Sequence, residues 1–289
     1  FAAAPSVFEE GVTLWYGLDF QKEDEGRGRQ LIEAASAAAF PMAVAYCHFR
    51  GWGGYAVDFH AAFVMFKDIA VETGYAHAEN MLGLCFQKGY GVDQDPTQAV
   101  AWFTVSAEKE NSPAMNNLGD CFEEGDGVEK NPVAAFEWYA KSAETGNSRA
   151  MSNLGVCYES GDGVERNLTK AVEWYTKSAE SGDSDAMFNL ADCFEFGNGV
   201  EKSLAKALEW YTKARYGGEE EEDLDEAIER VRNNIAGGDG NVNMEEEEEE
   251  AEAEAEEEDD DDEDYDDDEE DEEADALAAL TSLVSFAAT

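Results

Sequence analysis

The chain repeats itself every 36 residues, and this period constrains its fold more than any other feature of the sequence. A fixed period between about 20 and 50 residues is the signature of a solenoid, in which each repeat packs mainly on its neighbours. A stack of this kind presents a long continuous surface, which suits the binding of another protein better than catalysis. Three types of residue recur at this spacing, namely Cys85, Cys121, Cys157 and Cys193, then Leu118, Leu154 and Leu190, then Trp102, Trp138, Trp174 and Trp210.

Each repeat is predicted to contain two amphipathic helices, and residues 114–149 illustrate why. Apolar residues around Leu118 follow helical spacing, and the glycine-rich turn at 125–127 then ends the first helix. Asn131 and Pro132 begin the second helix, because Asn is a good N-cap and Pro fits the first helical turn. The period therefore predicts no strand, a row of glycine turns along one edge, and helices near residues 79–88, 97–109, 115–124, 133–145, 151–160, 169–181, 187–196 and 205–215.

The recurring Trp and Cys residues are predicted to lie in the core. We expect Trp138 and Trp174 to be largely buried between helices. The single cysteine of each repeat is interpreted as a small buried residue, neither disulfide-bonded nor metal-bound. Equivalent atoms on packed helices are about 8–10 Å apart, whereas a disulfide needs Cα atoms within about 7 Å.

The period and the composition together predict five regions. Four clear repeats occupy 78–218, and more degenerate repeats precede them in 1–77. A capping helix is predicted at 219–238, because the stretch DLDEAIERVRNNI is amphipathic. The segment 239–275 is expected to be disordered, since its like charges repel and it has almost no apolar residues to bury. Residues 276–289 are interpreted either as a frayed end or as a short motif that becomes helical on a partner.

The chain is strongly acidic, with a formal net charge of −49. Between Glu245 and Asp275 there are 26 acidic residues and no Lys or Arg, and the part before this segment is acidic as well. Binding of nucleic acid requires clustered positive charge, so we expect no nucleic-acid partner. The charge favours protein partners with basic segments. No stretch approaches 18 consecutive apolar residues, so no transmembrane segment is predicted.

The repeats resemble a known family. The recurring pattern A-x-x-N-L-G with a GxGV turn and a W-Y-x-K segment is similar to the Sel-one-like repeat (SLR), a relative of the tetratricopeptide repeat. The resemblance implies a right-handed α-solenoid that acts as a non-enzymatic adaptor or scaffold, for example in a quality-control ubiquitin ligase assembly. The GxGV turn occurs four times, at 89–92, 125–128, 161–164 and 197–200.

The resemblance also implies where a ligand would bind, because the first helices of tetratricopeptide-type stacks line a concave surface. The column of Asn117, Asn153 and Asn189 has two interpretations, namely that these amides bind a peptide backbone or that they join successive repeats. No catalytic, metal or cofactor-binding residue is predicted. The predicted protein-binding residues are Met81, Leu84, Lys88, Asn117, Asp120, Glu124, Asn153, Val156, Ser160, Asn189, Asp192 and Phe196.

Sequence features that could indicate chemistry have simpler interpretations. Ser203 and Lys206 match the S-x-x-K pattern of penicillin-recognising enzymes, but the companion motifs are absent and Ser203 occupies a helix N-cap position. The three histidines form no zinc pattern. Two alternatives to the scaffold remain, namely an acidic chaperone for basic proteins and a hydrolase of the bacterial SLR type.

The compartment is left open. Unpaired thiols are typical of the cytosol or nucleus. The start Phe-Ala-Ala-Ala-Pro resembles the mature start of proteins imported into complex algal plastids, so a plastid or a secretory lumen also stays possible.

Overall fold

The computed structural model describes residues 22–37, 39–217 and 222–237, and every regular element within these ranges is an α-helix. The helices are α2 (Lys22–Ala37), α3 (Pro41–Arg50), α4 (Phe59–Thr73), α5 (Ala76–Lys88), α6 (Pro96–Ala107), α7 (Ser112–Glu124), α8 (Pro132–Glu144), α9 (Ser148–Ser160), α10 (Leu168–Glu180), α11 (Ser184–Phe196), α12 (Leu204–Gly217) and α13 (Glu222–Gly237).

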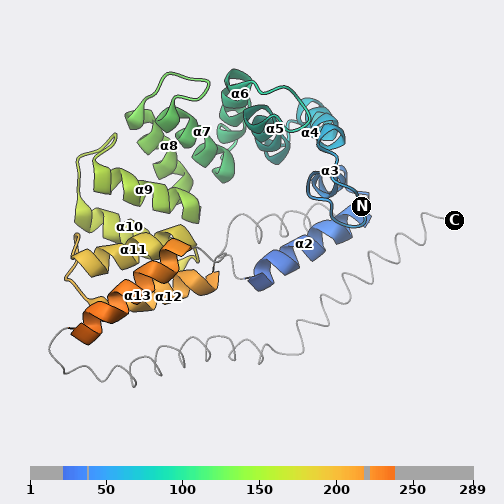
Figure 1. Ribbon diagram of the computed structural model, residues 1–289. Helices are drawn as coiled ribbons and strands as arrows, with labels where there is room; N and C mark the ends of the chain where they lie inside the picture. Colours follow the sequence, from blue (N-terminus) through green and yellow to red (C-terminus); the bar gives the residue numbers. More distant parts are fainter. Residues whose placement is uncertain (1–21, 38, 218–221, 238–289) are drawn as a thin grey trace.

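Consecutive helices pack on one another around an arc (Figure 1), which confirms the predicted all-α solenoid. The first helices of the four clear repeats are α5, α7, α9 and α11, and the second helices are α6, α8, α10 and α12. All eight predicted helices are present. The acidic segment 239–275 and the possible motif at 276–289 lie outside the described residues.

Side-chain caps decide where the helices begin. Asn111 accepts a hydrogen bond from the backbone N–H of Ala114 at 3.1 Å, and Asn147 and Asp183 cap α9 and α11 in the same way. These caps start the first helices three residues earlier than predicted, since they satisfy backbone N–H groups that would otherwise lack a partner. The second helices are capped by Asp95, Asn131, Asn167 and Ser203, as predicted for the last three.

The GxGV turns keep successive repeats in register. Gly127 has a positive φ of 73°, and a Cβ at this position would lie 2.1 Å from the backbone oxygen of Pro96 in the previous repeat. Only glycine permits both this backbone conformation and this close approach. The same approach joins Gly91 to Phe59, Gly163 to Pro132 and Gly199 to Leu168, so the turns lie along one edge, as predicted. In Figure 1 the turns after α7 and α9 lie on the outer rim of the arc.

The second helices bury tyrosine more deeply than tryptophan. Tyr139 and Tyr175 are fully buried, whereas Trp138 and Trp174 pack against the core with a smaller part of each side chain exposed, in line with the expectation that the tryptophans are largely buried. Adjacent residues of a helix point about 100° apart, so the two rings of a Trp-Tyr pair cannot both point into the core. A lysine ammonium lies over each indole ring, with Lys141 Nζ 3.9 Å from the centre of the Trp138 ring and Lys177 Nζ 4.2 Å from that of Trp174. The four recurring cysteines are buried and unpaired, as predicted.

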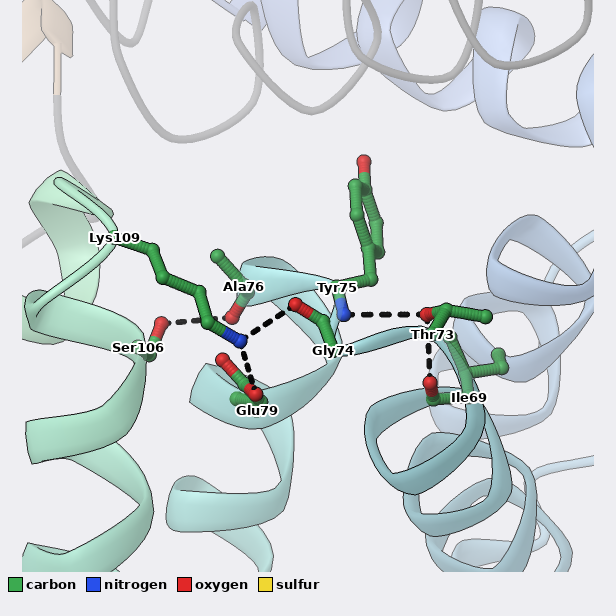
Figure 2. Close-up of polar contacts among 8 residues, drawn as sticks. All are labelled: Ile69, Thr73, Gly74, Tyr75, Ala76, Glu79, Ser106 and Lys109. Atoms are coloured by element: carbon green, nitrogen blue, oxygen red, sulfur yellow. Dashed lines mark hydrogen bonds and ion pairs between the residues drawn. The ribbon is translucent and has the colours of Figure 1, made fainter.

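Side chains from neighbouring repeats join the first clear repeat to the helix before it. Figure 2 shows Lys109, which follows α6, reaching back to the chain between α4 and α5. Its ammonium donates to the backbone oxygen of Gly74 at 2.6 Å and to the carboxylate of Glu79. Ser106 in α6 donates to the backbone oxygen of Ala76 at 2.7 Å. These contacts tie three helices together at one end of the repeat.

Helix α13 covers the last repeat. Leu224, Ala227, Ile228 and Val231 are buried against α11 and α12. Arg230 adds two hydrogen bonds to the Glu195 carboxylate, at 2.9 and 2.8 Å. Burial of an apolar face of this kind stabilises a terminal helix that would be marginal alone.

Candidate protein-interaction surface

The four first helices lie side by side and form one face of the solenoid, which we call the first-helix face. Hydrogen bonds join α5 to α7 and α7 to α9, and α9 packs on α11. The second helices form the opposite layer, the second-helix face. All twelve residues predicted to bind a partner lie on α5, α7, α9 or α11.

The structure distributes these twelve residues over three levels of exposure. Met81 has 0% exposure, so its assignment to the surface was wrong, because this apolar side chain is buried in the core cluster of the first repeats. The half-buried members are Leu84, Asn117, Asp120, Asn153, Asn189 and Asp192, and the exposed members are Lys88, Glu124, Val156, Ser160 and Phe196.

Two amides of the asparagine column join successive repeats. Asn117 Nδ2 donates to Asn80 Oδ1 at 2.9 Å. Asn153 Nδ2 donates to Asn116 Oδ1 at 3.1 Å and to Asp120 Oδ1 at 3.3 Å. For these two residues the structural interpretation of the column therefore holds.

The tyrosines of the second helices donate to carboxylates of the first helices. The Tyr139 hydroxyl is shared between two carboxylates, since its oxygen lies 2.8 Å from Asp120 and 2.7 Å from Glu123. Tyr175 donates to Glu159 at 2.7 Å, and its second potential acceptor position holds Val156. Tyr211 repeats the full pattern with Asp192 and Glu195. Sequence reasoning missed these pairs, although the columns Tyr139, Tyr175, Tyr211 and Glu123, Glu159, Glu195 also recur every 36 residues.

Burial changes the acidity of this face. It raises the pKa of Asp120 to about 6, although the Tyr139 hydroxyl and the Arg149 charge act in the opposite direction. Burial also raises the pKa of Asp192. The pKa of Glu195 is lowered instead, because Arg230 donates two hydrogen bonds to its carboxylate. Arg230 belongs to α13, outside the repeats, and no periodic signal could have predicted its role.

The two faces differ in charge. The first helices α5, α7, α9 and α11 carry eight acidic and two basic residues, whereas the second helices α6, α8, α10 and α12 carry five acidic and six basic residues. Among the helices of the repeats, the first helices therefore carry the net negative charge, although Glu79 and Glu195 are buried and paired with Lys109 and Arg230. Such a field attracts positively charged segments and raises their rate of encounter.

The described residues contain few groups placed for chemistry. Among them, no three His, Cys, Asp or Glu side chains converge in a way that could hold a metal ion. Burial raises the pKa of Cys85, Cys121, Cys157 and Cys193 to about 12, so these thiols are poor nucleophiles at neutral pH. No helix in the described part of the chain is both long and apolar enough to cross a membrane.

Stacked helical hairpins that pack mainly on their neighbours define the class of α-solenoid repeat proteins. The Sel1 repeat model matches residues 36–67, 76–111, 112–147, 148–183 and 184–219. The chain therefore belongs to the Sel1 repeat family, whose members generally serve as protein-interaction scaffolds. One of the matched repeats, 36–67, lies in the region interpreted from the sequence as degenerate.

Solved structures with a similar fold include two bacterial proteins. A protective antigen of uropathogenic Escherichia coli strains that displays an SLR fold is 28% identical, with a TM-score of 0.61, and the match covers 82% of this chain and 50% of that chain. A Sel1 repeat protein from Oxalobacter formigenes is 30% identical, with a TM-score of 0.56, and the match covers 75% of this chain and 86% of that chain. No curated protein matches the chain.

Proposed function

We propose that this chain is a non-enzymatic scaffold that binds basic segments of other proteins on its first-helix face. The observation that carries the proposal is the unequal charge of the two layers, eight acidic and two basic residues against five and six. Glu124 on α7 and Asp185 on α11 are exposed on the acidic layer, and Asp192 on α11 is half-buried. The family resemblance implies that the setting is a multi-protein assembly, such as a quality-control ubiquitin ligase complex.

Matched charge variants test the proposal. We expect the double variant Glu124→Gln and Asp185→Asn on the first-helix face to weaken binding of a basic peptide several-fold. The matched double variant Glu137→Gln and Glu173→Gln removes two exposed charges from the second-helix face and should bind as the unchanged protein does. The probe is a fluorescein-labelled 12-residue peptide with six Lys or Arg residues and one central Leu, measured by fluorescence anisotropy on the full chain. Equal weakening by both double variants would show that only net charge matters and would contradict the proposal.

The acidic segment between Glu245 and Asp275 is proposed to assist this binding by raising the local concentration of basic partners. The screening length at physiological salt is about 8 Å, so the segment acts on a partner that is already close. Removing residues 245–289 should slow association with the basic peptide and reduce its salt dependence, while dissociation changes little. Stopped-flow kinetics at two salt concentrations measure both rates. An association rate that deletion leaves unchanged would mean that the segment serves solubility alone.

The same deletion tests the alternative of an acidic chaperone, which the 26 acidic residues of that segment favour. A chaperone that acts through the segment should lose its ability to keep a basic protein such as lysozyme soluble when residues 245–289 are removed. A scaffold that acts through the first-helix face should retain peptide binding after the deletion. Light scattering and anisotropy on the same two proteins separate the two functions.

A further inference from the structure

The hydrogen bonds of the asparagine column follow a fixed rule across the repeats. Each asparagine can reach the residues 37 and 33 positions before it on the preceding first helix, as Asn153 does with Asn116 and Asp120. Asn117 finds Asn80 at the first of these positions and uses it. The rule shows which side chains a repeat must supply to hold the amide of the next one.

The last asparagine of the column meets neither of the partners that the other two use. At the positions equivalent to Asn116 and Asp120, Asn189 faces Ser152 and Val156. A serine is too short to replace an asparagine side chain, and valine accepts no hydrogen bond. Within the described residues the Asn189 side chain makes no hydrogen bond, and it is only half-buried. Its amide is therefore available to a ligand at the surface of the first-helix face.

The part of this face around Asn189 has exposed apolar side chains as well as the acids Asp185 and Asp192. Of the large apolar side chains on α5, α7, α9 and α11, only Val156 and Phe196 are exposed, at 40% and 58%. Phe196 lies seven residues beyond Asn189 on α11, and thus on the same face of the helix about 10 Å away. The equivalent positions in the other repeats hold Lys88, Glu124 and Ser160. The Arg230 guanidinium, which Glu195 holds, lies 6.0 Å from the centre of the Phe196 ring, and Phe196 is still 58% exposed.

We propose that Asn189, Val156 and Phe196 form the specificity-determining site of the first-helix face, and that this site takes an extended peptide that carries an apolar side chain between basic residues. A carboxamide offers both a donor and an acceptor, so it can bond the C=O and the N–H of one peptide residue. Three extended residues span about 10 Å, the separation between Asn189 and Phe196. Glu124 on α7 and Asp185 on α11, both exposed, favour the basic flanks. This inference rests on the proposed function and names the part of the surface that selects the partner.

The repeats themselves supply the sharpest test. Position 156 is equivalent to position 120, where Asp120 accepts a hydrogen bond from Asn153. In Val156→Asp the new carboxylate should therefore accept a hydrogen bond from the amide of Asn189 and make this amide unavailable to the ligand. The added negative charge alone would strengthen binding of a basic peptide, so the two explanations predict opposite signs. We expect Val156→Asp and Asn189→Ala each to weaken binding of the peptide with the central Leu by about tenfold, the loss expected for one or two hydrogen bonds. Phe196→Ser should reduce the preference for this peptide over the matched peptide with a central Ser.

Thermal unfolding of every variant accompanies these anisotropy measurements on the full chain. Asn153→Ala is the matched control, because its amide serves the repeats and its loss should lower the melting temperature. Suppose that the double variant Glu124→Gln and Asp185→Asn weakens binding while Val156→Asp, Asn189→Ala and Phe196→Ser do not. This inference is then wrong and the proposed function stands. If neither set weakens binding, the proposed function fails as well. Tighter binding after removal of residues 276–289, or a dimer that dissociates in Asn189→Ala, would assign the site to the chain itself and would also overturn the inference.

Discussion

The interface between α7 and α9 and the interface between α9 and α11 have the same elements, the same spacing and the same asparagine, yet their chemistry differs. In the first, Asn153 is held by Asn116 and Asp120. In the second, Asn189 faces Ser152 and Val156 and makes no side-chain hydrogen bond within the described residues. The comparison teaches that a recurring residue does not have a recurring role. The residues one repeat earlier decide whether an amide of this column forms a hydrogen bond to the preceding repeat.

The largest expected effect concerns the packing beneath the two interfaces. A Cβ added to Gly155 in α9 would lie 2.4 Å from the Tyr175 ring, whereas the equivalent position in α11 already holds Ala191 above Tyr211. Gly155→Ala should therefore destabilise the protein by about 1–3 kcal/mol, as overpacking of a core does. Urea unfolding followed by circular dichroism measures the free energy. Ala191→Gly is the matched change and should cost no more than about 1 kcal/mol. A Gly155→Ala variant as stable as the unchanged protein would show that both repeats accommodate alanine equally.

The second prediction compares the two amides directly. Asn153→Ala removes two hydrogen bonds and leaves the side-chain oxygen of the buried Asn116 without this donor, while Asp120 keeps Tyr139 as a donor, so it should lower the free energy of unfolding by about 1–3 kcal/mol. Asn189→Ala removes no bond seen among the described residues and should change stability by less than about 0.5 kcal/mol. Thermal and urea unfolding of the two variants in parallel would check this. Equal losses in both would mean that Asn189 is held in solution as firmly as Asn153.

The smallest expected effect is the change of stability with pH. It is expected for the α7–α9 interface, which contains Asp120, and not for the α9–α11 interface, where the equivalent residue is Val156. Burial raises the pKa of Asp120 from its ordinary value of 3.8 to about 6. A group whose pKa is raised on folding favours the folded state below its unfolded pKa, and this contribution is lost as the pH rises through the folded pKa. Lowering the pH from 7.5 to 5 should thus raise the melting temperature by about 2 °C. The rise should shrink in Asp120→Asn, and an unchanged rise would assign it to other acids.

The sequence predicted the helices and the turns because each depends on local residues that recur, such as Gly127 and Asn131. It placed the first helices three residues too late, since their caps at Asn111, Asn147 and Asp183 belong to the end of the preceding repeat in the frame that begins at Ala114. Burial was harder to predict. Trp138 and Tyr139 are adjacent and both aromatic, and only the three-dimensional packing selects the tyrosine for the core.

The candidate surface was predicted in outline and not in detail. The position in the repeat was sufficient to place eleven residues at or near the surface of the first helices, but it gave the same role to Asn117, Asn153 and Asn189. Their partners lie on another helix, and the offsets of 37 and 33 residues that connect them depend on how the helices stack. Met81 was misplaced for a similar reason, because the position that is polar in later repeats is an apolar core residue at the start of the clear stack.

Because all five cysteines are buried, we expect them to react slowly with thiol reagents. Burial raises the pKa of the four recurring thiols to about 12 and also raises the pKa of Cys47, the fifth cysteine, so the reactive thiolate form is disfavoured at pH 7. An Asn189→Cys variant would consequently carry one fast-reacting sulfur on a background that does not react. A fluorophore or cross-linker could be attached at this single point without removing any native cysteine. The proposed binding surface could thus be labelled at one chosen residue in the otherwise unchanged protein.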